Sequence, residues 1–277
     1  MKRSFNYLAK KIDLDERSKY LRRNIIQCIE ATRRGHIGSA MSLVEILRVL
    51  YDDILKYNSK NPNQFKRDKL ILSKGHGCLA LYSLLADKGF FLKKHLKTTC
   101  QFDSILGGHP EYGKVPGVEA STGSLGHGLP IAVGLAISEK LNKTKNYIFV
   151  IIGDGELNEG SNWEALLSAS KHRLDNLIIM LDYNKIQSYG PTNQVLDLEP
   201  ISAKIKAFNL FVNEVNGHDL RDIKNRILEC KKAKRPSFII CHTIKGKGIS
   251  FAENNPFWHH KNNLDDETIN TLYKEVG

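Results

Sequence analysis

The sequence has few of the features that mark secreted, zinc-binding or membrane proteins. Its 277 residues include five cysteines, and no two of them are spaced Cys-x-x-Cys. Scattered cysteines in odd number argue against a disulfide framework or a zinc site and favour a reducing cytoplasm. Apolar runs such as 148–152 and 177–181 fall far short of the roughly 20 residues of a membrane span, so no membrane association is predicted. The basic N-terminus MKRSFNYLAK is not followed by a long apolar stretch, which argues against a signal peptide.

Acidic residues are scarce relative to basic ones. Lys and Arg total 41 against 30 for Asp and Glu, which gives a net charge of +11. Basic pairs such as Arg22-Arg23 and Lys231-Lys232 are spread over helix-like segments rather than gathered in one arm. The surplus of basic side chains is interpreted as part of a solvated surface. Alternatively, these side chains attract phosphorylated substrates or an acidic partner. No stacking aromatics interleave with these charges, so no nucleic-acid binding is predicted.

Apolar strands and helices alternate along the chain, most regularly from about residue 146. Strands are expected at 70–72, 147–152, 177–181, 211–215 and 237–241. Helices are expected at 13–34, 43–51 (with Ser42 as its cap), 77–86, 158–171, 201–208 and 220–231. Strands that are apolar throughout and alternate with helices indicate a parallel sheet covered by helices on both faces. We therefore predict one α/β domain over residues 1–277, with a looser tail after about 245.

The stretch GDGELNEG at 153–160 places acidic and amide side chains directly after a predicted strand. In parallel sheets, ligands bind at the carboxyl ends of the strands. Asp154 follows one strand and Asn184 the next, so neighbouring strands would bring both to one edge. A carboxylate, an amide oxygen and a nearby carbonyl suit Mg²⁺ or Ca²⁺. The flanking glycines let a diphosphate approach the backbone, and the helix expected from about Asn158 points N–H groups toward it.

Several histidines lie among glycines. They occur in GHIGS at 35–39, SKGHG at 73–77 and GGHPE at 107–111, and a further glycine-rich loop, STGSLGHG, spans 121–128. Imidazoles titrate near neutral pH and can hydrogen-bond sugar hydroxyls or shuttle their protons. Four other histidines are interpreted as surface or structural residues: His95, His172, His218 and His242.

Together with GDGELNEGSNWEA at 153–165, these segments resemble the N-terminal, diphosphate-binding half of transketolase. The resemblance runs from about residue 13 to 262. Deoxyxylulose-phosphate synthase shares part of this plan, but the chain resembles transketolase more closely. It implies the PP-type thiamine diphosphate-binding fold, thiamine diphosphate with Mg²⁺ (Ca²⁺ or Mn²⁺ as substitutes), and transfer of a two-carbon ketol unit from a ketose phosphate to an aldose phosphate. Whether this serves the pentose phosphate pathway or a specialised sugar is left open.

The resemblance also assigns roles to individual residues. Metal ligands are expected at Asp154, Asn184 and the carbonyl of Ile186. Cofactor contacts are expected from Asp154 and Asn184 and also from His76, Gly123, Leu125, Gly155 and Glu159. Catalytic contacts are expected from His36, His109, Glu159 and His259, with His260 as the competing choice for the last histidine.

Three acidic residues of the 153–165 segment are given different roles. By resemblance, Glu159 and Glu164 belong to an interface where a chain of acids and water links two active sites, and such carboxylates would titrate as a unit. The alternative is that both are ordinary helix-surface acids. Glu156 has no assigned role and is interpreted as a solvated first-turn acid favoured by the helix dipole. His127 replaces a glutamine common in the family, and its effect is left open.

Transketolase carries further essential residues on a second α/β domain. By resemblance, these include the glutamate beside the aminopyrimidine and most residues that grip the sugar phosphate. We therefore expect a separate C-terminal subunit, a heterotetramer of two chains of each kind, and sugar phosphate substrates. Two alternatives stay open: a subunit of a related thiamine-dependent synthase for a specialised sugar, and a non-catalytic binding module.

Overall fold

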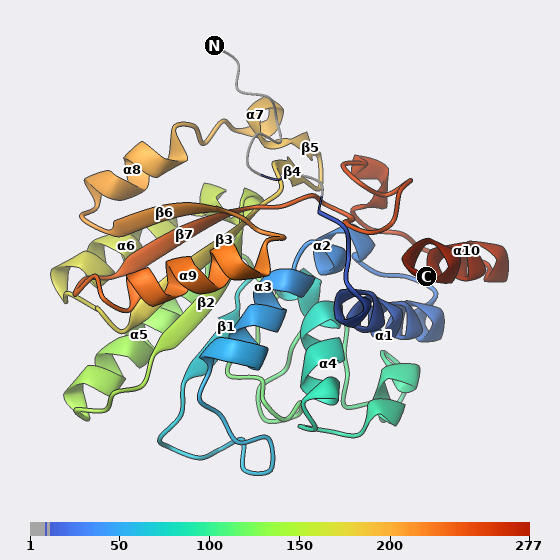
Figure 1. Cartoon of the computed structure of the whole chain (residues 1–277), viewed down its shortest axis with the longest axis horizontal. Coiled ribbons are helices and arrows are strands. Elements are labelled where there is room, and N and C mark those ends of the chain that lie inside the picture. The colour runs from blue at the N-terminus through green and yellow to red at the C-terminus, as the bar shows by residue number, and fades with distance from the viewer. Residues whose placement is uncertain (1–8, 10–11) are drawn as a thin grey trace.

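The core of the molecule is a five-stranded parallel sheet with strand order β1-β2-β3-β7-β6 (Figure 1). The computed structural model describes residue 9 and residues 12–277, so most of the N-terminal basic segment lies outside the described residues. The strands are β1 Lys69–Leu72, β2 Ile148–Gly153, β3 Leu177–Tyr183, β6 Phe211–Asn216 and β7 Ser237–His242. A small antiparallel pair, β4 Ile186–Gln187 and β5 Gly190–Pro191, follows β3. All five predicted strands are confirmed to within two residues at each end.

Helices cover both faces of the sheet because side chains alternate along each strand. In β2, Phe149 and Ile151 belong to one buried core, while Ile148, Val150 and Ile152 belong to the other. The first core is closed by α1 Glu16–Thr32, α3 Val44–Val49, α4 Cys78–Asp87 and α9 Leu220–Cys230. The second is closed by α5 Gly128–Leu141, α6 Gly160–Lys171 and α8 Ile201–Ala207. The predicted fold class, a parallel sheet covered on both faces, is confirmed.

Two predicted helix starts are wrong. Ser42 does not cap a helix; α2 Ile37–Met41 precedes it, α3 begins at Val44, and the π-helix η1 Leu50–Ile54 continues it. Instead, the Ser42 hydroxyl donates to the buried carboxylate of Asp182 at 2.7 Å. The helix expected from Asn158 is preceded by a 3₁₀ turn, η4 Gly155–Asn158, and α6 starts at Gly160. The backbone next to Asp154 is therefore a tight turn rather than an α-helix N-terminus.

The segment after residue 245 is packed rather than loose. Ile249 and Ala252 are fully buried, and the 3₁₀ helix η5 Pro256–Trp258 follows them. The last helix, α10 Asp266–Val276, lies against α1 and buries one apolar face. Gly35 and Lys261 exchange backbone hydrogen bonds of 2.9 and 3.0 Å, which hold the segment beside the GHIGS loop. The structure differs here from the predicted looser tail because apolar residues spaced along this segment find partners near the N-terminus.

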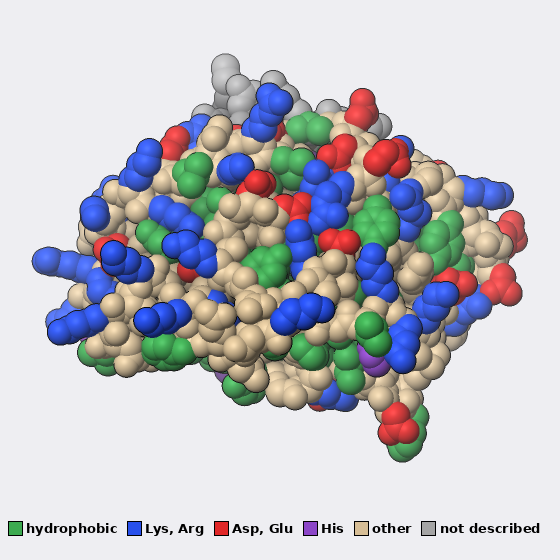
Figure 2. Space-filling model, turned by 60° about the horizontal axis from the view of Figure 1, so that its bottom comes forward, with side chains coloured by type: hydrophobic (Ala, Val, Ile, Leu, Met, Phe, Trp, Pro, Cys, Tyr) green, Lys and Arg blue, Asp and Glu red, His purple; other side chains and the backbone are tan. Residues whose placement is uncertain are grey.

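The remaining short elements are η2 Gly75–Gly77, η3 Lys93–Thr98 and α7 Thr192–Val195. Within the described part of the chain, no helix has the length and apolar character needed to cross a membrane. Lys and Arg side chains are scattered over the face shown in Figure 2, with acidic side chains among them, as expected for a solvated basic surface.

Candidate functional site

The predicted site residues meet at the carboxyl edge of the sheet. β2 and β3 are direct neighbours, with Gly153 opposite Asp182, so the strand adjacency on which the site prediction depended is confirmed. A cavity of about 330 Å³ opens at this edge. Every predicted cofactor, metal and histidine position except Glu159 lines it: His36, His76, His109, Gly123, Leu125, Asp154, Gly155, Asn184, Ile186 and His259.

One end of the cavity gathers hard oxygen atoms. The Asp154 carboxylate is buried and accepts from the N–H of Gly155 at 2.8 Å. Burial raises the pKa of Asp154 to about 6, although the ammonium of Lys245 opposes the shift. Asn184 and Ile186 line the same cavity. The Asn184 side-chain oxygen accepts from the Ile186 N–H at 3.1 Å, and the Ile186 carbonyl accepts from Lys245 at 2.6 Å. No cluster of three or more His, Cys, Asp or Glu side chains is placed to hold a metal among residues 12–277, so a cation here would depend on these mixed oxygens.

The cavity has buried polar atoms without partners, which tests its fit for a polar ligand. Among the described residues, the Ser39 hydroxyl and the Gln187 side-chain nitrogen are buried with no hydrogen-bond partner, and both residues line the cavity. Because unsatisfied buried polar groups are costly, such atoms point to a missing ligand. A Cβ at Gly155 would lie 2.9 Å from the Cβ of Gln187, so glycine is required for the close packing here. The residues present therefore fit a diphosphate with its cation.

Two buried lysines that sequence reasoning missed, Lys74 and Lys245, add positive charge to this end. Each is 2% exposed and each lines the cavity. Lys74 pairs with Asp182, which also accepts from Ser42 and Thr243. Burial acts to raise the pKa of Asp182, but Lys74 and these hydrogen bonds outweigh it and leave the pKa below its ordinary value. The sequence feature that could have indicated these two lysines is a lysine directly before a glycine, in SKGHG for Lys74 and in IKGKG for Lys245.

Glu156 is not the solvated acid that was predicted. It is 1% exposed, and its carboxylate accepts from the Ser73 hydroxyl and from the N–H groups of Gly126 and Gly153. Burial raises the pKa of Glu156 despite these donors. Glu156 therefore ties together three glycine-rich segments that line the cavity. The prediction failed because the partners that bury Glu156, Ser73 and Gly126, are distant from it in the sequence.

Four histidines, His36, His76, His109 and His259, line the cavity, and the His260 ring lies next to them. The His36 ring lies 4.5 Å from His260, 5.3 Å from His76, 5.4 Å from His259 and 6.3 Å from His109, centroid to centroid. Burial is the first cause that lowers the pKa of all five, to about 4 for His36 and about 3 for His259. At neutral pH these imidazoles are neutral, so each offers one N–H donor and one acceptor nitrogen. That combination suits sugar hydroxyl groups.

We expect Gly123→Ala to displace His109. Gly123 has a φ of +151°, and a Cβ there would lie 2.9 Å from the ring of His109. The substitution should lower the free energy of unfolding by about 1–3 kcal/mol in urea denaturation and shift the His109 proton signals in NMR. Gly113→Ala is the matched control, because Gly113 has a φ of +81° with open space around it. Equal losses of unfolding free energy in the two variants would show that backbone strain alone causes the effect, without a clash with His109.

Three other residues discussed from the sequence lie outside the cavity. Glu159 and Glu164 are exposed, and Glu159 packs beside Gly126, where a Cβ would lie only 2.6 Å from the Cβ of Glu159. His127 is exposed and turns its Nδ1 toward the Leu125 carbonyl at 3.0 Å. Glu159, a predicted cofactor contact, therefore does not line this cavity. Its position at an interface remains a prediction.

Comparison with known proteins identifies the family. The profile described as "Transketolase, thiamine diphosphate binding domain" matches residues 15–277. The chain belongs to the transketolase family. It is 44% identical to an apulose-4-phosphate transketolase subunit of Actinobacillus succinogenes, covering 92% of this chain and 93% of that relative. A 6-deoxy-6-sulfo-D-fructose transketolase subunit of a Clostridium species is 40% identical, with 87% and 88% covered.

Solved transketolases share the fold as well as the sequence. The Campylobacter jejuni enzyme superposes with a TM-score of 0.88 at 34% identity, covering 95% of this chain and 42% of that one. The Leishmania mexicana enzyme gives a TM-score of 0.87 at 33% identity, with 94% and 40% covered. The chain thus spans about two fifths of these transketolases, and it corresponds to their thiamine diphosphate-binding domain.

Proposed function

We propose that this chain is the N-terminal subunit of a transketolase that moves a two-carbon ketol unit between sugars with thiamine diphosphate and Mg²⁺. The observation that carries the proposal is the single cavity that joins the oxygen cluster at Asp154 to the histidine cluster at His36. An anion-binding end and a hydroxyl-binding end in one cavity are what a diphosphate cofactor and a sugar require. Mn²⁺ or Ca²⁺ would fit the same oxygen ligands.

The chain's own residues bind and orient the reactants. Asp154, Asn184 and the Ile186 carbonyl would hold the cation, while Lys74 and Lys245 offset the charge of the diphosphate. When bound, thiamine diphosphate supplies the electron sink for making and breaking the carbon–carbon bond. His36, His109 and His259, kept neutral by burial, would hydrogen-bond the sugar hydroxyls and exchange protons with them.

We propose that a second chain completes the site. The relatives that match this chain over most of their length are named as transketolase subunits, which supports a two-chain enzyme. We place Glu159 and Glu164 at an interface between two copies of this chain within a 2+2 heterotetramer.

The substrates are proposed to be sugars that carry an anionic group. The names of the relatives include a phospho sugar and a sulfo sugar. A second cavity of about 260 Å³ shares His36, His76 and His109 with the cofactor cavity, so it lies directly beside the hydroxyl-binding end. Arg34 lines it, and no Asp or Glu does among the residues that the structure describes. We propose that the anionic end of one sugar enters this outer cavity.

Arg34→Gln is expected to raise the KM for an anionic sugar about tenfold and to leave the KM for its uncharged analogue nearly unchanged. Hydrogen bonds to charged groups contribute roughly 1.5–3 kcal/mol. Among residues 12–277, Arg34 has no ion-pair partner, whereas Arg33 pairs with Asp266 at 2.6 Å. Arg33→Gln is therefore the matched control and should change neither KM appreciably. Similar changes in the two variants would refute a subsite at Arg34.

The experiment that tests the function mixes the purified chain with a candidate C-terminal transketolase subunit, thiamine diphosphate and Mg²⁺. Ketol transfer is then assayed with several anionic and neutral ketose donors. We expect transfer only when both chains and the cofactor are present, and highest with an anionic donor. No transfer from any donor, with cofactor still bound, would favour a non-catalytic binding module. Transfer restricted to one unusual sugar would favour the specialised synthase.

A further inference from the structure

A cavity of about 530 Å³ lies at the amino edge of the sheet. Tyr147 directly precedes β2 and Asn176 directly precedes β3, and both residues line this cavity. Because the two strands run parallel, their other ends carry Asp154 and Asn184. The volume falls within the range of small-molecule sites, roughly 300–1,000 Å³. The sheet therefore separates this basal cavity from the cofactor cavity.

The lining of the basal cavity is strongly basic. Among the residues that the structure describes, Asp175 is its one acidic residue, and five lysines line it as well: Lys56, Lys140, Lys145, Lys231 and Lys234. Asp175 pairs with Lys140 at 2.9 Å. The other four lysines have no ion-pair partner within residues 12–277. Four positive charges of the lining are therefore left uncompensated.

Two buried carboxylates contact the lining but do not neutralise it. Asp68 accepts from the backbone N–H groups of Lys56 at 3.0 Å and Tyr147 at 2.7 Å. Glu139 accepts from the side chain of Asn146 at 2.8 Å and forms its ion pair with a lysine outside the cavity. These acids hold the backbone and the amide of the lining in place. The lysine charges are left for a ligand.

One of the unpaired lysines is half-buried. The Nζ of Lys231 lies 4.6 Å from the centroid of the Tyr147 ring, which holds the lysine against the wall of the cavity. Burial lowers the pKa of Lys231, and although Asp68 opposes the shift, the charge of Lys56 adds to it. Since partial burial and a like charge both disfavour the ammonium, a bound anion would stabilise it.

One acceptor of the lining lacks a donor. The Nδ2 of Asn176 donates to the Ala136 carbonyl at 3.0 Å, which orients the amide. Its Oδ1 is buried with no hydrogen-bond partner in the part of the chain that the structure describes. Buried acceptors without partners are costly, and a hydroxyl group of a ligand would satisfy this one. We propose that the basal cavity binds a small phosphate ester with several negative charges and free hydroxyl groups, the class that includes sugar bisphosphates and nucleotides.

The test is isothermal titration calorimetry of the full chain in metal-free buffer, with fructose 1,6-bisphosphate and ATP as probes and inorganic phosphate as the reference. We expect at least one ester to bind at least about tenfold more tightly than phosphate, because several lysines contact one ligand. Binding of the bisphosphate alone would identify a sugar bisphosphate site, and binding of ATP alone a nucleotide site.

The double variant Lys145→Gln/Lys234→Gln assigns the binding to the basal cavity. Both lysines are exposed, so the fold should be unaffected, and the Kd for the ester should rise at least about tenfold. Lys94→Gln/Lys97→Gln is the matched control, because it removes the same charge from exposed positions of η3 outside this cavity. Its Kd should change less than about twofold, since distant surface charges are screened by salt.

Three results would overturn the proposal. If neither ester binds more tightly than inorganic phosphate, or if both double variants lose affinity equally, general surface charge explains the binding. If Lys145→Gln/Lys234→Gln keeps full affinity, the ester binds elsewhere, for instance beside Lys74 and Lys245. The inference goes beyond the proposed function and does not depend on it, because the cavity lies at the other edge of the sheet and no readout measures ketol transfer.

Discussion

Asp154→Ala is expected to abolish retention of thiamine diphosphate by this chain in the presence of Mg²⁺. Asp154 is the one carboxylate of the oxygen cluster formed with Asn184 and Ile186. Loss of groups that merely orient metal ligands typically costs 10–100-fold in affinity, so loss of the ligand itself should cost at least about 100-fold. Isothermal titration calorimetry of the chain, with the partner subunit present, measures the effect.

Asp175→Ala is the control for this experiment. Asp175 is partly exposed, pairs with Lys140 at 2.9 Å and lines a different cavity beside the start of β3. Its loss removes the same charge from the chain without touching the site, so affinity should stay within about twofold, because exposed ion pairs contribute less than about 1 kcal/mol. Full cofactor affinity in Asp154→Ala would contradict the metal assignment.

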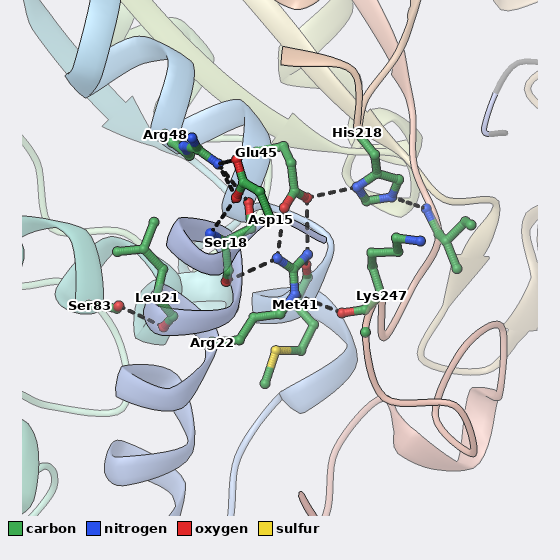
Figure 3. Close-up of polar contacts among 12 residues, drawn as sticks. Asp15, Ser18, Leu21, Arg22, Met41, Glu45, Arg48, Ser83, His218 and Lys247 are labelled. Carbon is green, nitrogen blue, oxygen red and sulfur yellow. Dashed lines mark hydrogen bonds and ion pairs between the residues drawn. The ribbon is translucent and has the colours of Figure 1, made fainter. Parts of the chain in front are cut away.

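Arg22→Met is expected to destabilise the fold by about 3–5 kcal/mol, since it leaves a buried carboxylate without its charge partner. Arg22 is fully buried and binds Glu45 through two hydrogen bonds of 2.7 and 3.0 Å (Figure 3). Its remaining donors reach the carbonyls of Met41 and Lys247, which joins α1 to the GHIGS region and to the segment after β7. Urea denaturation should show a lower midpoint with an unchanged slope.

The surroundings of Glu45 explain the size of this effect. Burial acts to raise its pKa, but Arg22 and His218 outweigh burial and hold the pKa well below its ordinary value. The Nδ1 of His218 lies 2.8 Å from Glu45 (Figure 3). The Nε2 of His218 accepts the N–H of Ile244. Arg226→Met removes an exposed pair with Glu229 and should cost less than about 1 kcal/mol. Equal losses in both variants would contradict a buried network.

Much of the fold and the site follows from local sequence pattern. The apolar runs at β2, β3 and β7 are long enough to be buried on both faces, which indicates a parallel sheet. Residues that directly follow such strands, including Asp154 and Asn184, then have a predictable place at the carboxyl edge. The histidines were found because their glycine-rich surroundings differ from those of ordinary helix residues.

The rest depends on contacts between distant segments. Lys74 reaches Asp182 across 108 positions, and Ser73 reaches Glu156 across 83, so nothing local shows that these charged residues are buried. Ser42 has the sequence context of a helix cap, yet the same buried Asp182 takes its hydroxyl. His218 was interpreted as structural from its sequence, and its bond to Glu45 agrees with that interpretation.

The cation position is the most direct test of the central claim, that this chain anchors the diphosphate of the cofactor at the edge of β2 and β3. Crystals of the chain grown with thiamine diphosphate and Mn²⁺ would place the metal by its anomalous scattering. We expect one strong peak about 2–2.4 Å from the Asp154 carboxylate, the Asn184 side-chain oxygen and the Ile186 carbonyl oxygen, the spacing of hard cations from oxygen ligands. A cofactor-bound structure with the metal elsewhere, or with none of these oxygens in contact with it, would contradict the claim.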